Sequence, residues 1–276
     1  AVDFSRDGTR LATSSDDGVV KVWDITLGGG REWLTLPGEG GLAYSPDGSL
    51  LAIGSEGGDV HIYDAASGRE SFALTGHVGR VNAIAFAPSG STLATAGLVD
   101  GTARIWDATS GQESVTVHLA RSRGQESSPC SLRPTTLEEV FDIDLSSGNL
   151  LATGGWGGQS SSLIWDPATG ERLRILAEDP KQEPWGRSVD FSADGKLVAG
   201  EGWDDVFVWS VEDAGVLARI QQPQVTALAF SPDGTRLATG SINGDLNVWE
   251  ARTGRLLDAL TGDLGQVLDL AFSPDG

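Results

Sequence analysis

A short turn motif recurs along the whole chain, and this repeat constrains the fold more than any other feature. Each copy follows a run of alternating apolar residues, ends in glycine, and is followed by Leu-Ala-Thr or a close variant. Successive closing glycines are 40, 42, 58, 47, 39 and 42 residues apart, so the period is near 40 with two insertions. The seven copies are Ser5–Gly8, Ser45–Gly48, Ala87–Gly90, Ser146–Gly148, Ser192–Gly195, Ser231–Gly234 and Ser273–Gly276.

One unit of the repeat predicts four short antiparallel strands joined by tight turns. The Pro-Asp-Gly turns reverse the chain because proline fixes φ and glycine accepts φ > 0. The sixth unit shows all four strands, at Val225–Phe230, Arg236–Gly240, Asp245–Trp249 and Arg255–Leu260. A unit of this size cannot cover both of its apolar faces alone, so successive units are expected to stack around an axis as propeller blades.

The predicted third strands end in a recurring aromatic-acid pair. The pairs are Trp23-Asp24, Trp106-Asp107 and Trp165-Asp166, with variants at Tyr63-Asp64, Trp209-Ser210 and Trp249-Glu250. These six phased copies resemble the WD-repeat β-propeller family, in the style of bacterial WD-repeat arrays, and the resemblance spans essentially the whole chain. It implies an all-β fold with six complete four-stranded blades and the inner strand of a truncated seventh, Val267–Phe272. A seven-bladed ring is expected in the parent protein, and a larger double array stays open.

The repeat divides the chain into units without a second domain. We expect a single propeller excerpt over 1–276, with blades at approximately 1–39, 40–77, 78–135, 136–184, 185–222 and 223–264, a partial blade at 265–276, and an insertion loop at 118–135. The first residue is not methionine and opens inside the motif, so we expect a longer parent protein. We also expect a cytoplasmic location, although a signal peptide would lie outside this sequence.

The resemblance implies a buried structural network of histidine, Ser/Thr, aspartate and tryptophan in each blade. The third unit contains all four residues, and the first and sixth contain part of the set. The residues are His77, Thr95, Asp100 and Trp106; Thr13, Asp17 and Trp23; and Thr239, Asn243 and Trp249. A catalytic triad is the alternative interpretation of His77, Thr95 and Asp100, but a triad needs a nucleophile exposed in a pocket. We expect a structural role, because the same set recurs in degraded copies.

Composition excludes several classes of function. Nineteen Lys+Arg against 39 Asp+Glu give a net charge of −20, which argues against binding to nucleic acid or to an anionic membrane. One cysteine, Cys130, and three histidines predict no metal site and no intrachain disulfide. The glycine-rich stretches lack the strand–helix setting and the Lys-Ser/Thr of phosphate loops, so no cofactor is expected.

Two groups of residues are candidates for binding. Trp156, Trp185 and Trp203 lie in turns and connections at one rim of the fourth and fifth units, flanked by Arg187, Asp204 and Asp205. We predict a partner-binding patch there that favours a basic peptide; the alternative is that the tryptophans pack on their own blades. The insertion at 118–135 is interpreted as a surface loop, with partner docking or modification as the alternative.

These features favour a non-catalytic scaffold or sensor module of a larger bacterial signalling protein. Its partner would be a protein or peptide, including an effector domain of the same polypeptide. The alternative is an enzyme or a binder of a small ligand or metal that uses the central channel. We expect Asp142 and Asp144, like Asp3 and Asp190, to face the next blade or the channel. Convergence of these four carboxylates around an ion would favour the alternative.

Overall fold

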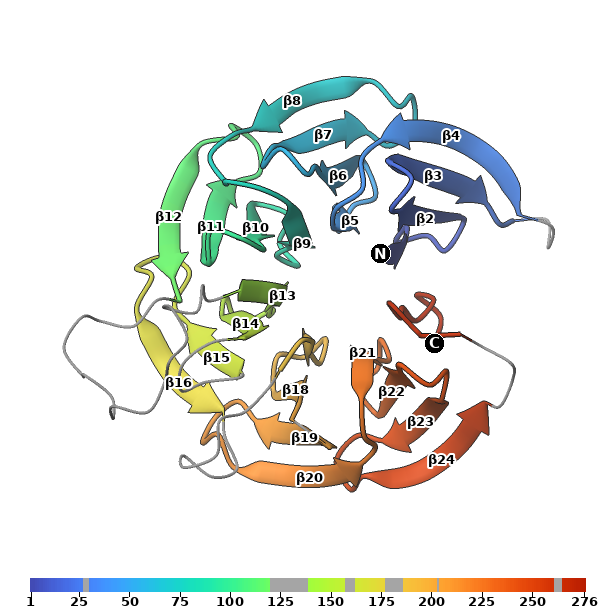
Figure 1. Ribbon diagram of the computed structural model, residues 1–276, viewed down its shortest axis with the longest axis vertical. Coiled ribbons are helices and arrows are strands. Elements are labelled where there is room, and N and C mark those ends of the chain that lie inside the picture. Colours follow the sequence, from blue (N-terminus) through green and yellow to red (C-terminus); the bar gives the residue numbers. More distant parts are fainter. Residues whose placement is uncertain (27–29, 120–138, 157–161, 177–185, 203, 261–264) are drawn as a thin grey trace, which may run out of the picture.

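The chain folds as a ring of antiparallel sheets in a computed structural model that describes residues 1–26, 30–119, 139–156, 162–176, 186–202, 204–260 and 265–276. Within these ranges 24 strands form six four-stranded sheets, and no helix is present. In each sheet the strands neighbour one another in chain order, with the first strand at the centre of the ring and the fourth at its outer rim (Figure 1). The predicted all-β propeller with six complete blades is therefore confirmed.

The strand bounds follow the repeat closely. Blades 1 to 3 comprise β1 (Val2–Phe4), β2 (Arg10–Ser15), β3 (Val19–Asp24) and β4 (Arg31–Pro37); β5 (Leu42–Tyr44), β6 (Leu50–Gly54), β7 (Val60–Asp64) and β8 (Glu70–Leu74); and β9 (Val81–Phe86), β10 (Thr92–Gly97), β11 (Thr102–Asp107) and β12 (Glu113–His118). Blades 4 to 6 comprise β13 (Glu139–Leu145), β14 (Leu151–Trp156), β15 (Ser162–Trp165) and β16 (Arg172–Leu176); β17 (Val189–Phe191), β18 (Leu197–Glu201), β19 (Asp205–Ser210) and β20 (Val216–Gln221); and β21 (Val225–Phe230), β22 (Arg236–Ser241), β23 (Leu246–Glu250) and β24 (Arg255–Leu260).

The turn between the first and second strands is stabilised by its own side chains. In blade 2, Ser45 Oγ donates to Asp47 Oδ1 at 2.6 Å, and Asp47 Oδ1 also accepts from the Ser49 amide at 3.0 Å. Gly48 closes the turn at φ 72°, a conformation that glycine adopts without steric cost. The hydrogen bonds from Ser45 and Ser49 hold the pKa of Asp47 at about 2. The turn motif thus fixes the register of the first two strands.

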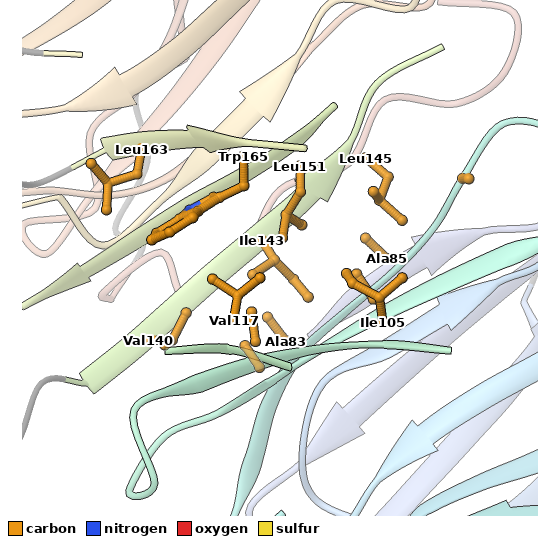
Figure 2. Packing of buried hydrophobic residues seen from close by; sticks show 14 residues of the cluster. Ala83, Ala85, Ile105, Val117, Val140, Ile143, Leu145, Leu151, Leu163 and Trp165 are labelled. Atoms are coloured by element: carbon orange, nitrogen blue, oxygen red, sulfur yellow. The ribbon is translucent and has the colours of Figure 1, made fainter. Parts of the chain in front are cut away.

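Neighbouring blades are held together by shared apolar clusters. Trp165 of blade 4 packs in one cluster with Ile105 and Val117 of blade 3, together with Val140 and Leu151 (Figure 2). Trp106 of blade 3 packs in the same way on blade 2. The third-strand tryptophan of these blades therefore packs against the blade before it, which explains why the tryptophan recurs with the period of the repeat.

The C-terminal segment 265–276 takes the inner position of a seventh blade, between β1 and β21 (Figure 1). The Val2 amide donates to Asp269 Oδ2 at 2.7 Å, and the Val267 amide donates to the Ser241 carbonyl at 3.0 Å. This segment forms no strand ladder in the described part of the chain, because an inner strand needs a second strand of its own blade as partner. All six residues of β24 are consequently exposed.

Candidate functional site

The polar network of blade 3 is assembled inside the blade. Trp106 Nε1 donates to Thr95 Oγ1 at 2.8 Å, Thr95 Oγ1 lies 2.8 Å from His77 Nε2, and His77 Nδ1 lies 2.9 Å from Asp100 Oδ2. Burial lowers the pKa of His77, although the hydrogen bond that its ring donates to Asp100 opposes this effect. The threonine is fully buried, so its hydroxyl is placed to join β10 to β11 and cannot reach a substrate.

Shorter versions of this network occur in three other blades. Trp23 Nε1 donates to Thr13 Oγ1 at 3.0 Å and Trp249 Nε1 donates to Thr239 Oγ1 at 2.8 Å. Asp17 is not joined to Thr13, because its Oδ1 accepts from the Val19 amide within its own turn. The same tryptophan–threonine bond forms in blade 4 between Trp165 and Thr153, a pair that our sequence reasoning missed although Leu-Ala-Thr marks it.

A glutamine replaces the histidine in blade 6. Thr239 Oγ1 donates to Gln222 Oε1 at 2.5 Å, and Asn247 Nδ2 donates to the same oxygen at 3.1 Å. Sequence reasoning missed Gln222, although it stands 17 residues before its threonine, much as His77 stands 18 before Thr95. Asn243 instead donates to the exposed Gln224 side chain at 3.2 Å. An amide can therefore take the place of imidazole in this fold.

The sequence predicted four aspartates that face the next blade or the channel, and in the structure these side chains line the channel and also bond to the next blade. The first strands surround a central channel of about 1010 Å³ that Asp3, Asp142, Asp144 and Asp190 line together with Asp269. Each carboxylate accepts a hydrogen bond from a main-chain amide of the following blade. The pairs are Asp3 with Tyr44 at 2.8 Å, Asp142 with Val189 at 3.0 Å, Asp144 with Phe191 at 2.7 Å, Asp190 with Phe230 at 2.6 Å and Asp269 with Val2 at 2.7 Å.

Burial gives these carboxyls unusual proton affinities. It raises the pKa of Asp3 to about 6 and that of Asp142 to about 7. Burial together with the charge of Asp144 raises the pKa of Asp190 well above its usual range, so the protonated Asp190 carboxyl donates a hydrogen bond to Asp144. Within the described ranges no three His, Cys, Asp or Glu side chains are placed to hold a metal ion. Their hydrogen bonds to main-chain amides make these aspartates links between neighbouring blades.

Glu201 is a further buried carboxyl, which the sequence analysis did not single out. It directly follows the position of the network threonine, where the other blades have Ser14, Gly54, Ala96, Gly154 and Gly240. Only 5% of Glu201 is exposed. Its Oε1 accepts from the Arg187 amide, and its Oε2 has no hydrogen-bond partner among the described residues. Burial raises its pKa to about 8. A charged residue at a small-residue position was the signal that could have revealed it.

The structure describes only part of the predicted partner-binding patch. Trp185, Trp203 and the side chain of Trp156 lie outside the described residues, as does most of the 118–135 insertion. Arg187 is exposed and its guanidinium lies 5.4 Å from the centroid of the Phe141 ring. Asp204 is exposed, whereas Asp205 forms an ion pair with Arg219 at 2.6 Å. Arg187 and Asp204 precede β17 and β19, so they lie at the same edge of blade 5.

The described residues contain no helix long and apolar enough to span a membrane. Comparison with known proteins identifies repeats described as "WD domain, G-beta repeat" at residues 1–24, 38–64, 68–107 and 216–250. Among similar proteins, tipD of Dictyostelium discoideum is 24% identical over 94% of this chain. The guanine nucleotide-binding protein subunit beta of Zea mays is 28% identical over 88% of it.

The chain spans 40% of the length of tipD and 66% of that of the maize subunit. Among solved structures, a chain of the mitotic checkpoint complex matches all of this chain and 81% of its own length, with a TM-score of 0.78 and 21% sequence identity. This likeness shows the fold alone. The matched repeats, the blade geometry and the tryptophan–threonine networks agree, and the chain belongs to the WD-repeat β-propeller family.

Proposed function

We propose that this chain is a non-catalytic interaction scaffold whose rim binds a protein or peptide. One observation carries the proposal: the histidine–threonine network of blade 3 and the channel aspartates, which are the groups that could have formed a catalytic site, are bonded within and between the blades. His77 and Thr95 are bonded inside blade 3, and Asp144 and Asp190 join blades 4, 5 and 6. A ring fixed in this way presents its loops in constant positions, which reduces the entropy lost when a partner binds.

The wider setting that we propose is a sensor or scaffold module of a larger signalling protein. The Phe-Ser-Pro-Asp-Gly turns favour a bacterial protein, for which we propose a cytoplasmic location, and the chain covers only part of the length of its relatives. The partner would be a separate protein or an effector domain of the same polypeptide. The net charge of −20 disfavours nucleic acid and anionic membranes as partners.

The loop rim of blades 4 and 5 is the surface that we propose for this partner. Arg187 and Asp204 are exposed at that rim. Asp205 follows Asp204 in the sequence, and its carboxylate is held by an ion pair with Arg219. The acidic groups would favour a basic peptide, and tryptophans with a nearby arginine are typical of binding hot spots. The proposed contact residues are Trp156, Trp185, Trp203, Arg187, Asp204 and Asp205.

Affinity capture with matched variants tests this proposal. The wild-type chain is immobilised, and the protein that it retains is identified and purified. The binding of this purified protein is then measured for the wild-type chain and for a variant in which Trp156, Trp185 and Trp203 are all replaced by serine. We expect the triple variant to bind that protein at least about tenfold more weakly at an unchanged Tm, and Asp204→Arg to weaken binding without affecting the fold. The control is Trp33→Ser, an exposed tryptophan on β4. Equal binding by the triple variant and the wild-type chain would contradict the proposed surface.

A further inference from the structure

The exposed apolar side chains are distributed unevenly around the ring. Of 12 large hydrophobic residues exposed in the described ranges, seven lie on the outer strands of blades 4 to 6, and none lies on β8 or β12. These outer strands follow one another around the rim (Figure 1). The seven residues are Leu173, Ile175, Val216, Leu217, Leu256, Leu257 and Leu260. Exposed apolar residues that gather on one side of a soluble protein indicate where an interaction site should be sought.

Charges on the outer strands follow a rule in blades 1 to 3. In each of these blades the outer strand has a glutamate opposite the aromatic residue of the third strand, and this glutamate pairs with a basic side chain on the third strand. The pairs are Lys21 with Glu32 at 2.9 Å, His61 with Glu70 at 2.9 Å and Arg104 with Glu113 at 2.6 Å. In blades 5 and 6 the outer-strand arginine also meets a carboxylate, Arg219 with Asp205 and Arg255 with Glu250.

Blade 4 reverses this rule. Arg172 stands opposite Trp165, where Glu32 stands opposite Trp23. Arg174 follows two residues later and donates to the Glu212 carbonyl at 2.8 Å. Among the described residues neither arginine has a carboxylate within 4.0 Å, in a chain with twice as many acidic as basic residues. The charge of Arg174 acts on Asp213 of blade 5 without forming an ion pair with it, so this strand presents positive charge that the fold offsets only in part.

The sequence of β16 alternates these arginines with exposed apolar residues. Leu173 is 43% exposed and Ile175 is 46% exposed, and they alternate along the strand with Arg172 and Arg174. The strand is the last of its sheet, so within the described ranges the hydrogen-bonding groups of its outer edge have no strand partner. An added strand would place its own side chains opposite those of β16 on the same faces.

We propose that β16 binds an extended segment of a partner protein in which acidic and apolar residues alternate. The segment would pair with the outer edge of the strand, its acids meeting Arg172 and Arg174 and its apolar residues meeting Leu173 and Ile175. This inference rests on the proposed scaffold function and adds a second surface, at the outer rim. The charge of −20 repels an acidic segment at long range, but exposed charges are screened beyond about 8 Å at physiological salt, so the local arginines determine the preference.

Fluorescence anisotropy with two labelled peptides tests the proposal. One peptide alternates glutamate and valine. The other has lysine in place of each glutamate and is the electrostatic control, because the net negative charge of the chain attracts it without regard to position. We expect the glutamate peptide to bind the wild-type chain more tightly than the lysine peptide. The double variant Arg172→Glu, Arg174→Glu should weaken the glutamate peptide by about tenfold and favour the lysine peptide.

Matched variants separate this edge from the rest of the rim. Leu173→Ser with Ile175→Ser should weaken binding, whereas Leu217→Ser and Arg255→Glu, at exposed positions on β20 and β24, should leave it unchanged. Preference for the lysine peptide, indifference to the charge reversal, or self-association that excludes the peptide would overturn the proposal. If the β16 variants still bind the partner identified by capture, the scaffold function stands and only this inference fails.

Discussion

Two equivalent leucines in different blades should contribute very differently to stability. Leu176 on β16 and Leu260 on β24 both face the third-strand residue that precedes the tryptophan by three positions. Leu176 is 0% exposed because blade 5 covers it, whereas Leu260 is 48% exposed beside the seventh position. The same substitution, leucine to alanine, therefore removes a fully buried side chain in one case and a half-exposed one in the other.

The size of the difference follows from burial. Leu176→Ala should lower the free energy of unfolding by about 2–5 kcal/mol, because it removes buried apolar area and leaves a cavity. Leu260→Ala should lower it by about 1 kcal/mol or less, since roughly half of the area is already in water and solvent fills the space. Urea unfolding followed by tryptophan fluorescence measures both, provided that the two variants share the wild-type m value.

Equal losses for the two variants would refute this reasoning. They would mean that the exposed face of β24 is covered in solution. A second copy of the chain on that face would make the loss at Leu260 depend on protein concentration, which sedimentation at several concentrations would reveal.

Three further outcomes follow from the buried polar groups. Trp106→Ala should lower the free energy of unfolding by about 3–5 kcal/mol, because it opens a cavity between blades 2 and 3 and removes the indole that donates to the Thr95 hydroxyl. A loss below about 1 kcal/mol in urea unfolding would contradict the blade register. Gln222→Leu should lower the free energy of unfolding by about 1–3 kcal/mol, because the Thr239 hydroxyl and the Asn247 amide lose their shared acceptor. Gln224→Leu, an exposed control, should change it by less than about 0.5 kcal/mol in the same assay. The pKa of Glu201 is raised from 4.5 to about 8 on folding, so the folded state binds its proton more tightly and stability should fall as pH rises through that interval. Glu201→Gln should make this fall shallower in melts between those pH values, and an unchanged slope would show that Glu201 is not the group responsible.

The sequence alone determined the repeat, the strand order within each blade and the position of each core tryptophan. Turn chemistry and strand alternation are local, and the register they set carries Trp106 onto Thr95 within one sheet, 11 residues away. The His77 network could be predicted from the sequence for the same reason, because its residues stand at spacings that recur from blade to blade.

Only the tertiary structure decided what lies between blades. Sequence spacing left open whether Asp144 would face the next blade or the channel, and it gave no sign that Asp144 would meet Asp190, because that contact depends on how one blade is rotated against the next. The Asp3 bond to Tyr44 joins residues 41 positions apart for the same reason. Exposure is also a tertiary property: Leu176 and Leu260 occupy one place in the repeat, and only the presence or absence of a neighbouring blade makes one a core residue and the other a surface residue.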